Sequence, residues 1–182
     1  ATLFQENNDR THLDEAMKWL TNSQDVDSVD DGCSCVFYLK NGWGVSYPET
    51  SGYILATYIA YAELTGDQSY IKRAIAIGDW EIKIQAPNGG VYSNPEPGDT
   101  RVFNTGQVIL GWCLLYEETG GQQYLDASIR AGDYLIAEQE EDGSWVKDTY
   151  SGPRTYEARV DWALLKLAKL SGNNSYRIVA IK

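Results

Sequence analysis

The stretch RAGDYLIAEQEEDGSW, residues 130–145, decides the fold class of this chain. It reads as the end of an amphipathic helix, then a Gly-containing turn, then a short extended run. Residues 52–91 match residues 106–145 at a constant offset of 54, with 12 identities in 40 positions. A third copy starts at Ala158 and matches the first at an offset of 106, and Trp19 and Gln24 mark an earlier partial copy. Self-similarity at a fixed period indicates a repeat architecture.

Length and composition indicate one folded unit with an acidic surface. The chain has 182 residues, of which 43% are apolar, so it can bury a sizeable core. We expect a single domain over 1–182, with repeats at about 47–101, 102–154 and 155–182. The net charge of −11 argues against nucleic acid and against an anionic membrane surface as partners. No apolar run is long enough to span a bilayer.

The cysteines and the single histidine bear on compartment and metal binding. Cys33, Cys35 and Cys113 have no framework spacing, which favours a reduced, cytoplasmic location. The N-terminus has the look of a trimmed end, so a periplasmic or secreted protein that has lost its signal stays an alternative. His12 is the only histidine, so we expect no zinc site, no other metal and no cofactor.

Helices are predicted from the spacing of apolar residues. The first should begin after Thr11 as a cap, and a loop should follow over 24–48, with a short hairpin within 33–46. Asn104 is the candidate cap of a later buried helix. Alternate helices are apolar nearly all round and therefore buried. The expected helices are 12–23, 50–65, 69–85, 105–119, 123–138, 157–171 and one that starts at Ser175.

The alternation of buried and amphipathic helices predicts an all-α fold of antiparallel helical hairpins in two layers. About seven helices make an incomplete (α/α) toroid, because a complete ring of six hairpins needs about twice as many. Lys182 falls inside the last predicted helix, so we expect either a piece of a longer unit or a half-ring. A half-ring would leave an apolar edge open, through which two copies could form a homodimer.

Two known groups of proteins resemble this chain. Gln139, Gly143 and Trp145 are spaced as in the Gln-Trp repeat of the terpene cyclase toroids, whereas the first repeat keeps Gln85 but has Val91 in place of the Trp. The hairpin length and the Gly-Gly-Val turns resemble the six-hairpin carbohydrate enzymes: unsaturated glucuronyl hydrolases, N-acylglucosamine 2-epimerases and uronyl epimerases. The segment GWGVSYPETSGY, residues 42–53, is similar to uncharacterised toroid proteins of bacterial polysaccharide pathways. The resemblance implies a fold but not a reaction.

Three long loops should meet on one face of such a fold. Loops 24–49, 86–104 and 139–156 each lead to the N-terminal end of a buried helix, where free N–H groups and the helix dipole favour an anionic or hydroxyl-rich ligand. Aromatic side chains in these loops suit stacking on sugar rings. The expected ligand-binding residues are Trp43, Tyr47, Tyr53, Asn104, Gln107, Tyr156, Arg159 and Trp162.

Catalysis on a sugar would need carboxyl groups at this face. Glu49 and Glu157 each lie near the start of a buried helix and are the candidate general acid and base. Both positions also suit simple stabilisation of the helix dipole, and that explanation stays open. Arg159 should either face the ligand, where a uronate carboxylate could pair with it, or pair with Glu157 or Asp161.

Three functions remain open from the sequence. The leading hypothesis is a carbohydrate-active toroid protein that acts on or binds an acidic poly- or oligosaccharide. If the protein is an enzyme, the resemblance implies a glycoside hydrolase or a sugar epimerase-like enzyme. The alternatives are a non-catalytic binding or scaffold module and a terpene cyclase-like protein, the last resting on the Gln139–Trp145 motif alone.

Overall fold

The computed structural model describes residues 6–26 and 30–182, and residues 1–5 and 27–29 lie outside that description. Within the described ranges the chain forms seven α-helices, one turn of 3-10 helix and one two-stranded hairpin. In chain order they are α1 (Glu6–Gln24), β1 (Phe37–Tyr38), β2 (Gly42–Trp43), α2 (Pro48–Thr65), α3 (Ser69–Lys83), α4 (Val102–Thr119), α5 (Gln122–Glu138), η1 (Thr155–Glu157), α6 (Ala158–Ser171) and α7 (Asn174–Ala180).

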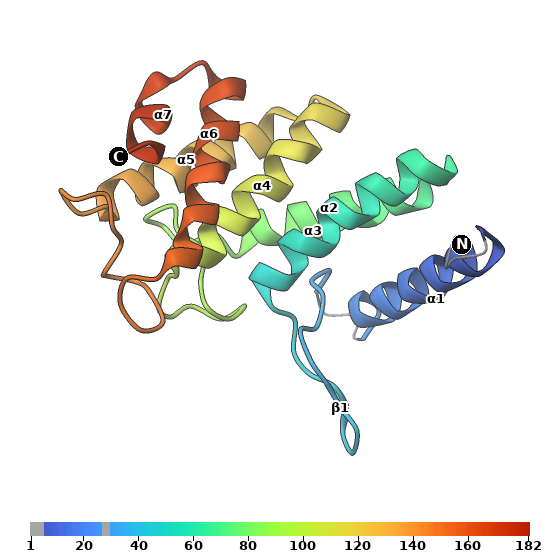
Figure 1. Cartoon of the computed structure of the whole chain (residues 1–182). Coiled ribbons are helices and arrows are strands. Elements are labelled where there is room, and N and C mark those ends of the chain that lie inside the picture. The colour runs from blue at the N-terminus through green and yellow to red at the C-terminus, as the bar shows by residue number, and fades with distance from the viewer. Residues whose placement is uncertain (1–5, 27–29) are drawn as a thin grey trace, which may run out of the picture.

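The helices form two layers, as the sequence predicts. The inner helices α2, α4 and α6 pack side by side, and α3, α5 and α7 pack behind them as the outer members of three antiparallel hairpins. Figure 1 shows the hairpins following one another from α1 near the N-terminus to α7 near the C-terminus. The β1–β2 hairpin projects away from the helices in this view.

The inner helix α6 is amphipathic, with only Val160, Ala163, Leu164 and Leu167 buried, so the expectation that it is buried nearly all round is wrong. The inner helices α2 and α4 are largely buried because nearly every face of each is apolar. In α4, for example, the run from Val102 to Cys113 is buried apart from Phe103. Each inner helix ends at a glycine in the left-handed region, Gly66, Gly120 or Gly172, with φ of 77°, 69° and 71°. A residue with a side chain rarely adopts such a φ, so these glycines fix the short turns between the layers.

Close approach of the layers depends on a glycine at the same place in two outer helices. A Cβ atom added to Gly78 would lie 2.3 Å from Leu115 Cδ1, and one added to Gly132 would lie 2.5 Å from Leu167 Cδ2. Both distances are shorter than a van der Waals contact. The repeated glycine therefore lets each outer helix pack directly against the inner helix of the following hairpin.

A glutamine at the end of each of the helices α1, α3 and α5 joins that helix to the outer helix of the following hairpin. Gln24 Nε2 donates to Arg73 O (3.2 Å), Gln85 Nε2 to Ala127 O (3.1 Å) and Gln139 Nε2 to Val179 O (3.2 Å). The three carbonyl groups belong to equivalent positions of successive repeats, because the offsets of 54 and 106 relate Arg73 to Ala127 and to Val179. The glutamine of the repeated motif is thus a connector between successive repeats, which we call the glutamine bridge.

Trp145 of the same motif also has a structural role. Its side chain is buried, and its Nε1 donates to Leu135 O at 3.0 Å. It fixes the chain after α5 to the end of that helix. Only a small part of the Trp145 side chain therefore lies at the surface.

Two details of the predicted helices are wrong. Helix α1 begins at Glu6, so Thr11 lies inside the helix and is not its cap. Helix α4 begins at Val102, so Asn104 is not a cap either and is instead buried within the first turn. The predicted hairpin is present, with Phe37 opposite Trp43 and Tyr38 opposite Gly42.

Candidate functional site

The three long loops reach the N-terminal ends of the inner helices on one face, which we call the mouth. The loop before α4 is held to the loop before α6, because Val102 N donates to Asp148 O (2.9 Å) and Thr100 Oγ1 donates to Asp148 Oδ2 (3.0 Å). On the opposite face only the short turns at Gly66, Gly120 and Gly172 connect the layers. The mouth is therefore the face on which loops can build a binding site.

Side chains of all three inner helices meet around Arg159. The Arg159 guanidinium carbon lies 5.0 Å from the centroid of the Tyr53 ring and 5.9 Å from that of Trp162. These residues line a cavity of about 130 Å³ together with Gln107. Within the described part of the chain Arg159 forms no ion pair, so neither Glu157 nor Asp161 is its partner. Its charge is available to a ligand, and the two rings hold it in place.

Glu49 lies close to this group. It lines a neighbouring cavity of about 250 Å³ with Phe103, Tyr150 and Tyr156. Burial raises the pKa of the Glu49 carboxyl group above its usual value, and the charge of Arg159 opposes that shift. A half-buried carboxyl group with a raised pKa keeps its proton to a higher pH than an exposed glutamate does.

A hydrogen-bonded network of polar groups forms the floor of the mouth. The hydroxyl groups of Tyr47 and Tyr150 share a short hydrogen bond, and Tyr150 also donates to Asn104 Oδ1 at 3.3 Å. Asn104 Nδ2 in turn donates to Tyr92 O at 3.4 Å. The Arg101 guanidinium carbon lies 5.2 Å from the Tyr150 ring centroid. Arg101 was not among the predicted site residues, because its position in a loop carries no periodic signal.

Glu157 lies apart from Glu49, in another cavity of about 220 Å³. It is 4% exposed, and neither carboxylate oxygen has a hydrogen-bond partner. Burial, and then the charge of Asp161, raise the pKa of Glu157 to about 7. Burial raises the pKa of Asp161, in the same cavity, to about 6. The two predicted catalytic carboxyl groups therefore line separate cavities.

Two other predicted ligand-binding residues have ring partners. Tyr156 packs edge-on against Phe103, with ring centroids 5.0 Å apart, at the edge of the Glu49 cavity. Trp43 packs against Trp19 of α1 and Phe37, with centroids 4.5 Å and 5.1 Å away. Trp43 thus lies in the projecting hairpin and lines none of the three cavities around Glu49, Arg159 and Glu157.

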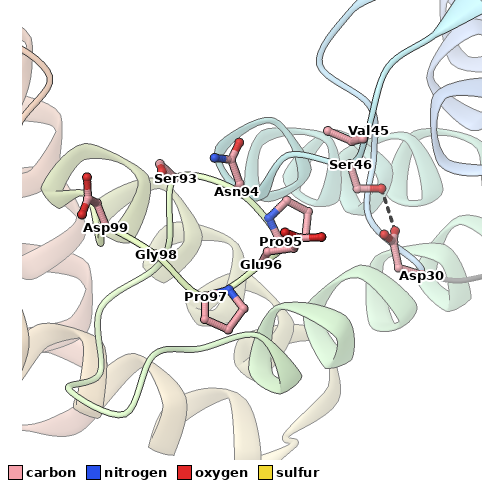
Figure 2. Close-up of a pocket in the computed structure, with 10 residues that line it drawn as sticks. All are labelled: Asp30, Val45, Ser46, Ser93, Asn94, Pro95, Glu96, Pro97, Gly98 and Asp99. Atoms are coloured by element: carbon pink, nitrogen blue, oxygen red, sulfur yellow. Dashed lines mark hydrogen bonds between the residues drawn. The ribbon is translucent and has the colours of Figure 1, made fainter.

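The largest of these cavities, about 700 Å³, lies between the base of the β1–β2 hairpin and the loop before α4 (Figure 2). Asp30 and Ser46, which share a hydrogen bond of 2.6 Å, form one side, and residues 93–99 form the other. Its lining mixes polar side chains with Val45, Pro95 and Pro97, and it contains no aromatic ring. The cavity extends the mouth toward the hairpin.

The structure also bears on metal binding and on membrane insertion. Across residues 6–26 and 30–182, no group of three or more His, Cys, Asp or Glu residues is placed to hold a metal ion. No helix in that part of the chain combines the length and the apolar character needed to cross a membrane. All three cysteines are free thiols.

Known proteins resemble this chain in sequence and in structure. No family model matches the sequence. A squalene–hopene cyclase from Zymomonas mobilis is 29% identical over 153 residues, which cover 72% of this chain and 22% of the cyclase. A family 76 glycoside hydrolase from a bovine Bacteroides thetaiotaomicron strain superposes with a TM-score of 0.76 at 21% identity, over 97% of this chain and 41% of that chain.

Two further solved structures have the same arrangement of helices. The unsaturated glucuronyl hydrolase of Bacillus sp. GL1 has a TM-score of 0.72 at 16% identity, over 96% of this chain and 53% of that one. A family 76 α-mannanase of Bacteroides thetaiotaomicron has a TM-score of 0.73 at 17% identity, over 94% of this chain and 52% of the mannanase chain. The chain has an (α/α)-toroid fold. Its seven helices span about half the length of these toroid enzymes and under a quarter of the cyclase.

Proposed function

We propose that this chain is a carbohydrate-active toroid protein whose mouth binds an acidic oligosaccharide. The observation that carries the proposal is Arg159, a cation held by the Tyr53 and Trp162 rings with no acidic partner among the described residues. A guanidinium can bind a carboxylate through two parallel hydrogen bonds, and aromatic faces pack against the apolar face of a sugar. The solved toroids that resemble the chain include glycoside hydrolases of mannan and of glucuronyl substrates.

If the protein is also an enzyme, Glu49 is the carboxyl group that the geometry favours as the proton donor. It is the acid beside Arg159, and its raised pKa keeps a fraction protonated at higher pH than an exposed glutamate. Glycoside hydrolysis needs a second carboxyl group, and Glu157 lines a separate cavity. The alternative is therefore a binding or scaffold module without catalysis. The experiment below distinguishes such a module from an enzyme.

A terpene cyclase-like function is the other candidate, favoured by the match to the squalene–hopene cyclase. The motif behind that resemblance has structural roles in this chain, because Gln139 bridges to Val179 and Trp145 is tied to Leu135. Cyclisation of a terpene needs a deep apolar cavity. The mouth instead exposes Arg159 and Glu49 among aromatic rings, which suits a polar ligand.

The proposal is tested by measuring affinity for matched acidic and neutral saccharides. Isothermal titration calorimetry with digalacturonate and with a neutral galactose disaccharide should show at least tenfold tighter binding of the acid, because only the acid can pair with Arg159. The Arg159→Gln variant should weaken digalacturonate binding by tenfold or more. Arg177→Gln removes an exposed arginine from α7 and serves as the control, with affinity unchanged within twofold.

Three outcomes would contradict parts of the proposal. Equal affinity for the two disaccharides would refute recognition of a carboxylate. Unchanged binding of digalacturonate by Arg159→Gln would show that the carboxylate is bound elsewhere. Binding without hydrolysis of any uronate-containing substrate, in the wild type and in Glu49→Gln alike, would favour the binding module over the enzyme.

A further inference from the structure

Glu157 replaces a residue that has a structural role in the first two repeats. The offsets of 54 and 106 place Glu157 at the position of Ser51 and Thr105. The Ser51 hydroxyl accepts a hydrogen bond from Cys33 N (2.8 Å), and the Thr105 hydroxyl accepts one from Val91 N (2.9 Å). Both bonds hold the preceding loop to an inner helix. The Glu157 carboxylate oxygens have no such partner.

Asp161 departs from the repeat in a similar way. Its equivalents are Leu55 and Ile109, which are fully buried in the apolar core. The junction of η1 and α6 thus carries two acidic side chains where the earlier inner helices carry a hydroxyl group and an aliphatic side chain. A buried acid without a partner is unfavourable, so such a substitution needs a compensating interaction.

The two acids line one cavity, which is built for a small polar ligand. The remaining lining comes from the turn at 143–145 and from residues 153–155, and it includes the Ser144 and Thr155 side chains, Pro153 and the buried Trp145. The volume of about 220 Å³ is several times the ~30 Å³ that a water molecule occupies in the liquid. The cavity therefore has room for a ring bearing hydroxyl groups and exceeds what a single ion needs.

No cation of the described chain forms an ion pair with Glu157 or Asp161. Arg154 lines the same cavity, but its guanidinium donates to Ser151 Oγ, at 3.0 and 2.7 Å, and not to either acid. Burial raises the pKa of both Glu157 and Asp161, which is the behaviour of carboxyl groups that lack a positive partner. The adjacent turn, Glu140 to Asp142, adds further negative charge. A positively charged ligand would meet a favourable potential here.

We propose that the Glu157–Asp161 cavity binds the ammonium group of an amino sugar. An organic cation fits better than a metal ion, because two carboxylates fall short of the ligand set of a hard cation and Trp145 and Pro153 supply apolar walls. An ammonium group offers three hydrogen bonds, which the carboxylate oxygens can accept. Ser144 and Thr155 can bond to ring hydroxyl groups.

This inference rests on the proposed saccharide-binding function of the mouth and narrows the saccharide. Arg159 and the Glu157–Asp161 pair lie on the same first turns of α6, so one oligosaccharide that crosses the start of this helix could reach both. Arg159 would bind an acidic unit and the acidic pair a unit with a free amine. The ligand is then a saccharide that carries both kinds of charge.

Three monosaccharides that differ at one substituent test the inference. Glucosamine carries the amine, N-acetylglucosamine has the same ring with the charge removed, and glucose lacks the nitrogen. Isothermal titration calorimetry and thermal shift at pH 7.5, above the pKa of about 7 of Glu157, should show binding of glucosamine at least tenfold tighter than of the other two. Glu157→Gln and Asp161→Asn should each weaken glucosamine binding by tenfold or more. Circular dichroism establishes that each variant is folded.

The control variant is Glu141→Gln, which removes an exposed acid next to the cavity without removing a lining residue. It should change glucosamine affinity by less than twofold, which would exclude a general effect of surface charge. The Arg159→Gln variant should also retain glucosamine binding. Digalacturonate binding that depends on Arg159, combined with no binding of glucosamine, would overturn this inference and leave the proposed function standing.

Other results would overturn the inference directly. Equal binding of glucosamine and N-acetylglucosamine would show that the charge is not recognised. Stabilisation by calcium chloride that Glu157→Gln abolishes, without an effect of glucosamine, would identify a metal site instead. Loss of glycoside hydrolysis in Glu157→Gln, with no binding of glucosamine to the wild type, would support the predicted catalytic role of Glu157 instead.

Discussion

Glu81 on outer helix α3 should destabilise the fold, and replacing it with leucine should stabilise the protein. Its side chain is 1% exposed, and neither carboxylate oxygen has a hydrogen-bond partner. The equivalent residue of the next repeat is Leu135, which is fully buried. The repeat therefore shows that this site accepts a leucine between the same kinds of helices.

The magnitude follows from the missing partners. A buried polar group without a hydrogen bond costs about 1–3 kcal/mol, and a leucine of similar size removes that cost. We expect Glu81→Leu to raise the free energy of unfolding by about 2 kcal/mol near pH 4, before the unfolded chain loses the Glu81 proton, and by more at neutral pH. Glu81→Gln keeps the unpaired polar group but cannot ionise, so it separates the cost of polarity from that of charge.

The gain should also depend on pH. Burial raises the pKa of Glu81 well above its usual value in the folded state, whereas the unfolded chain keeps a value near 4.3. The folded protein then binds more protons than the unfolded chain, so wild-type stability falls as the pH rises above about 4.3. The slope reaches up to about 1.4 kcal/mol per pH unit, and neither variant should show this contribution.

Urea unfolding at pH 5, 6, 7 and 8, followed by circular dichroism, measures both effects. The difference between Glu81→Leu and the wild type should grow steadily with pH. A leucine variant that is less stable than the wild type at pH 7 would refute the reasoning. So would a difference that is constant with pH, because Glu81 would then be ionised, or paired, in the folded protein.

Three further predictions concern the packing of the repeats. Gln85→Leu breaks the glutamine bridge to α5 and should lower the free energy of unfolding, measured by urea titration, by about 1–3 kcal/mol. An unchanged midpoint of urea unfolding would contradict this. Gly132→Ala should lower the free energy of unfolding by more than about 1 kcal/mol, because the helix packing leaves no room for the added Cβ. Gly98→Ala, in an open loop, should change it little. Equal losses of stability in the two variants would contradict this. Leu165 is exposed on α6, so Leu165→Glu should dissociate the predicted homodimer in light scattering, and a monomeric wild type would remove that prediction.

Much of the fold could be predicted because each repeat carries its own local signals. The apolar run of each inner helix and the glycine that ends it give the boundaries of α2, α4 and α6 to within a few residues. The start of α1 and the place of Asn104 were missed. Thr11 and Asn104 have the chemistry of caps, but both helices begin before them in the chain, at Glu6 and Val102.

The candidate site was predicted less completely, because it depends on the faces of helices and on contacts between distant loops. The sequence placed Glu49, Arg159 and Glu157 near helix starts, which is what the structure shows. The sequence could not show that Glu157 lines a different cavity from Glu49, because the placement of the two side chains depends on how α6 is rotated against its neighbours. The packing of Trp43 on Trp19 likewise joins segments that no periodicity relates.

The glutamine bridge bears on how the toroid unfolds. Each bridge couples one outer helix to the next, so the stability of a helix depends on its neighbours more than on its own sequence, as in a one-dimensional chain of interacting units. The last link ends on Val179, one residue before the end of the seven-residue helix α7. Loss of one bridge, as in Gln85→Leu, should therefore speed amide hydrogen exchange in the outer helices on both sides of it, α3 and α5.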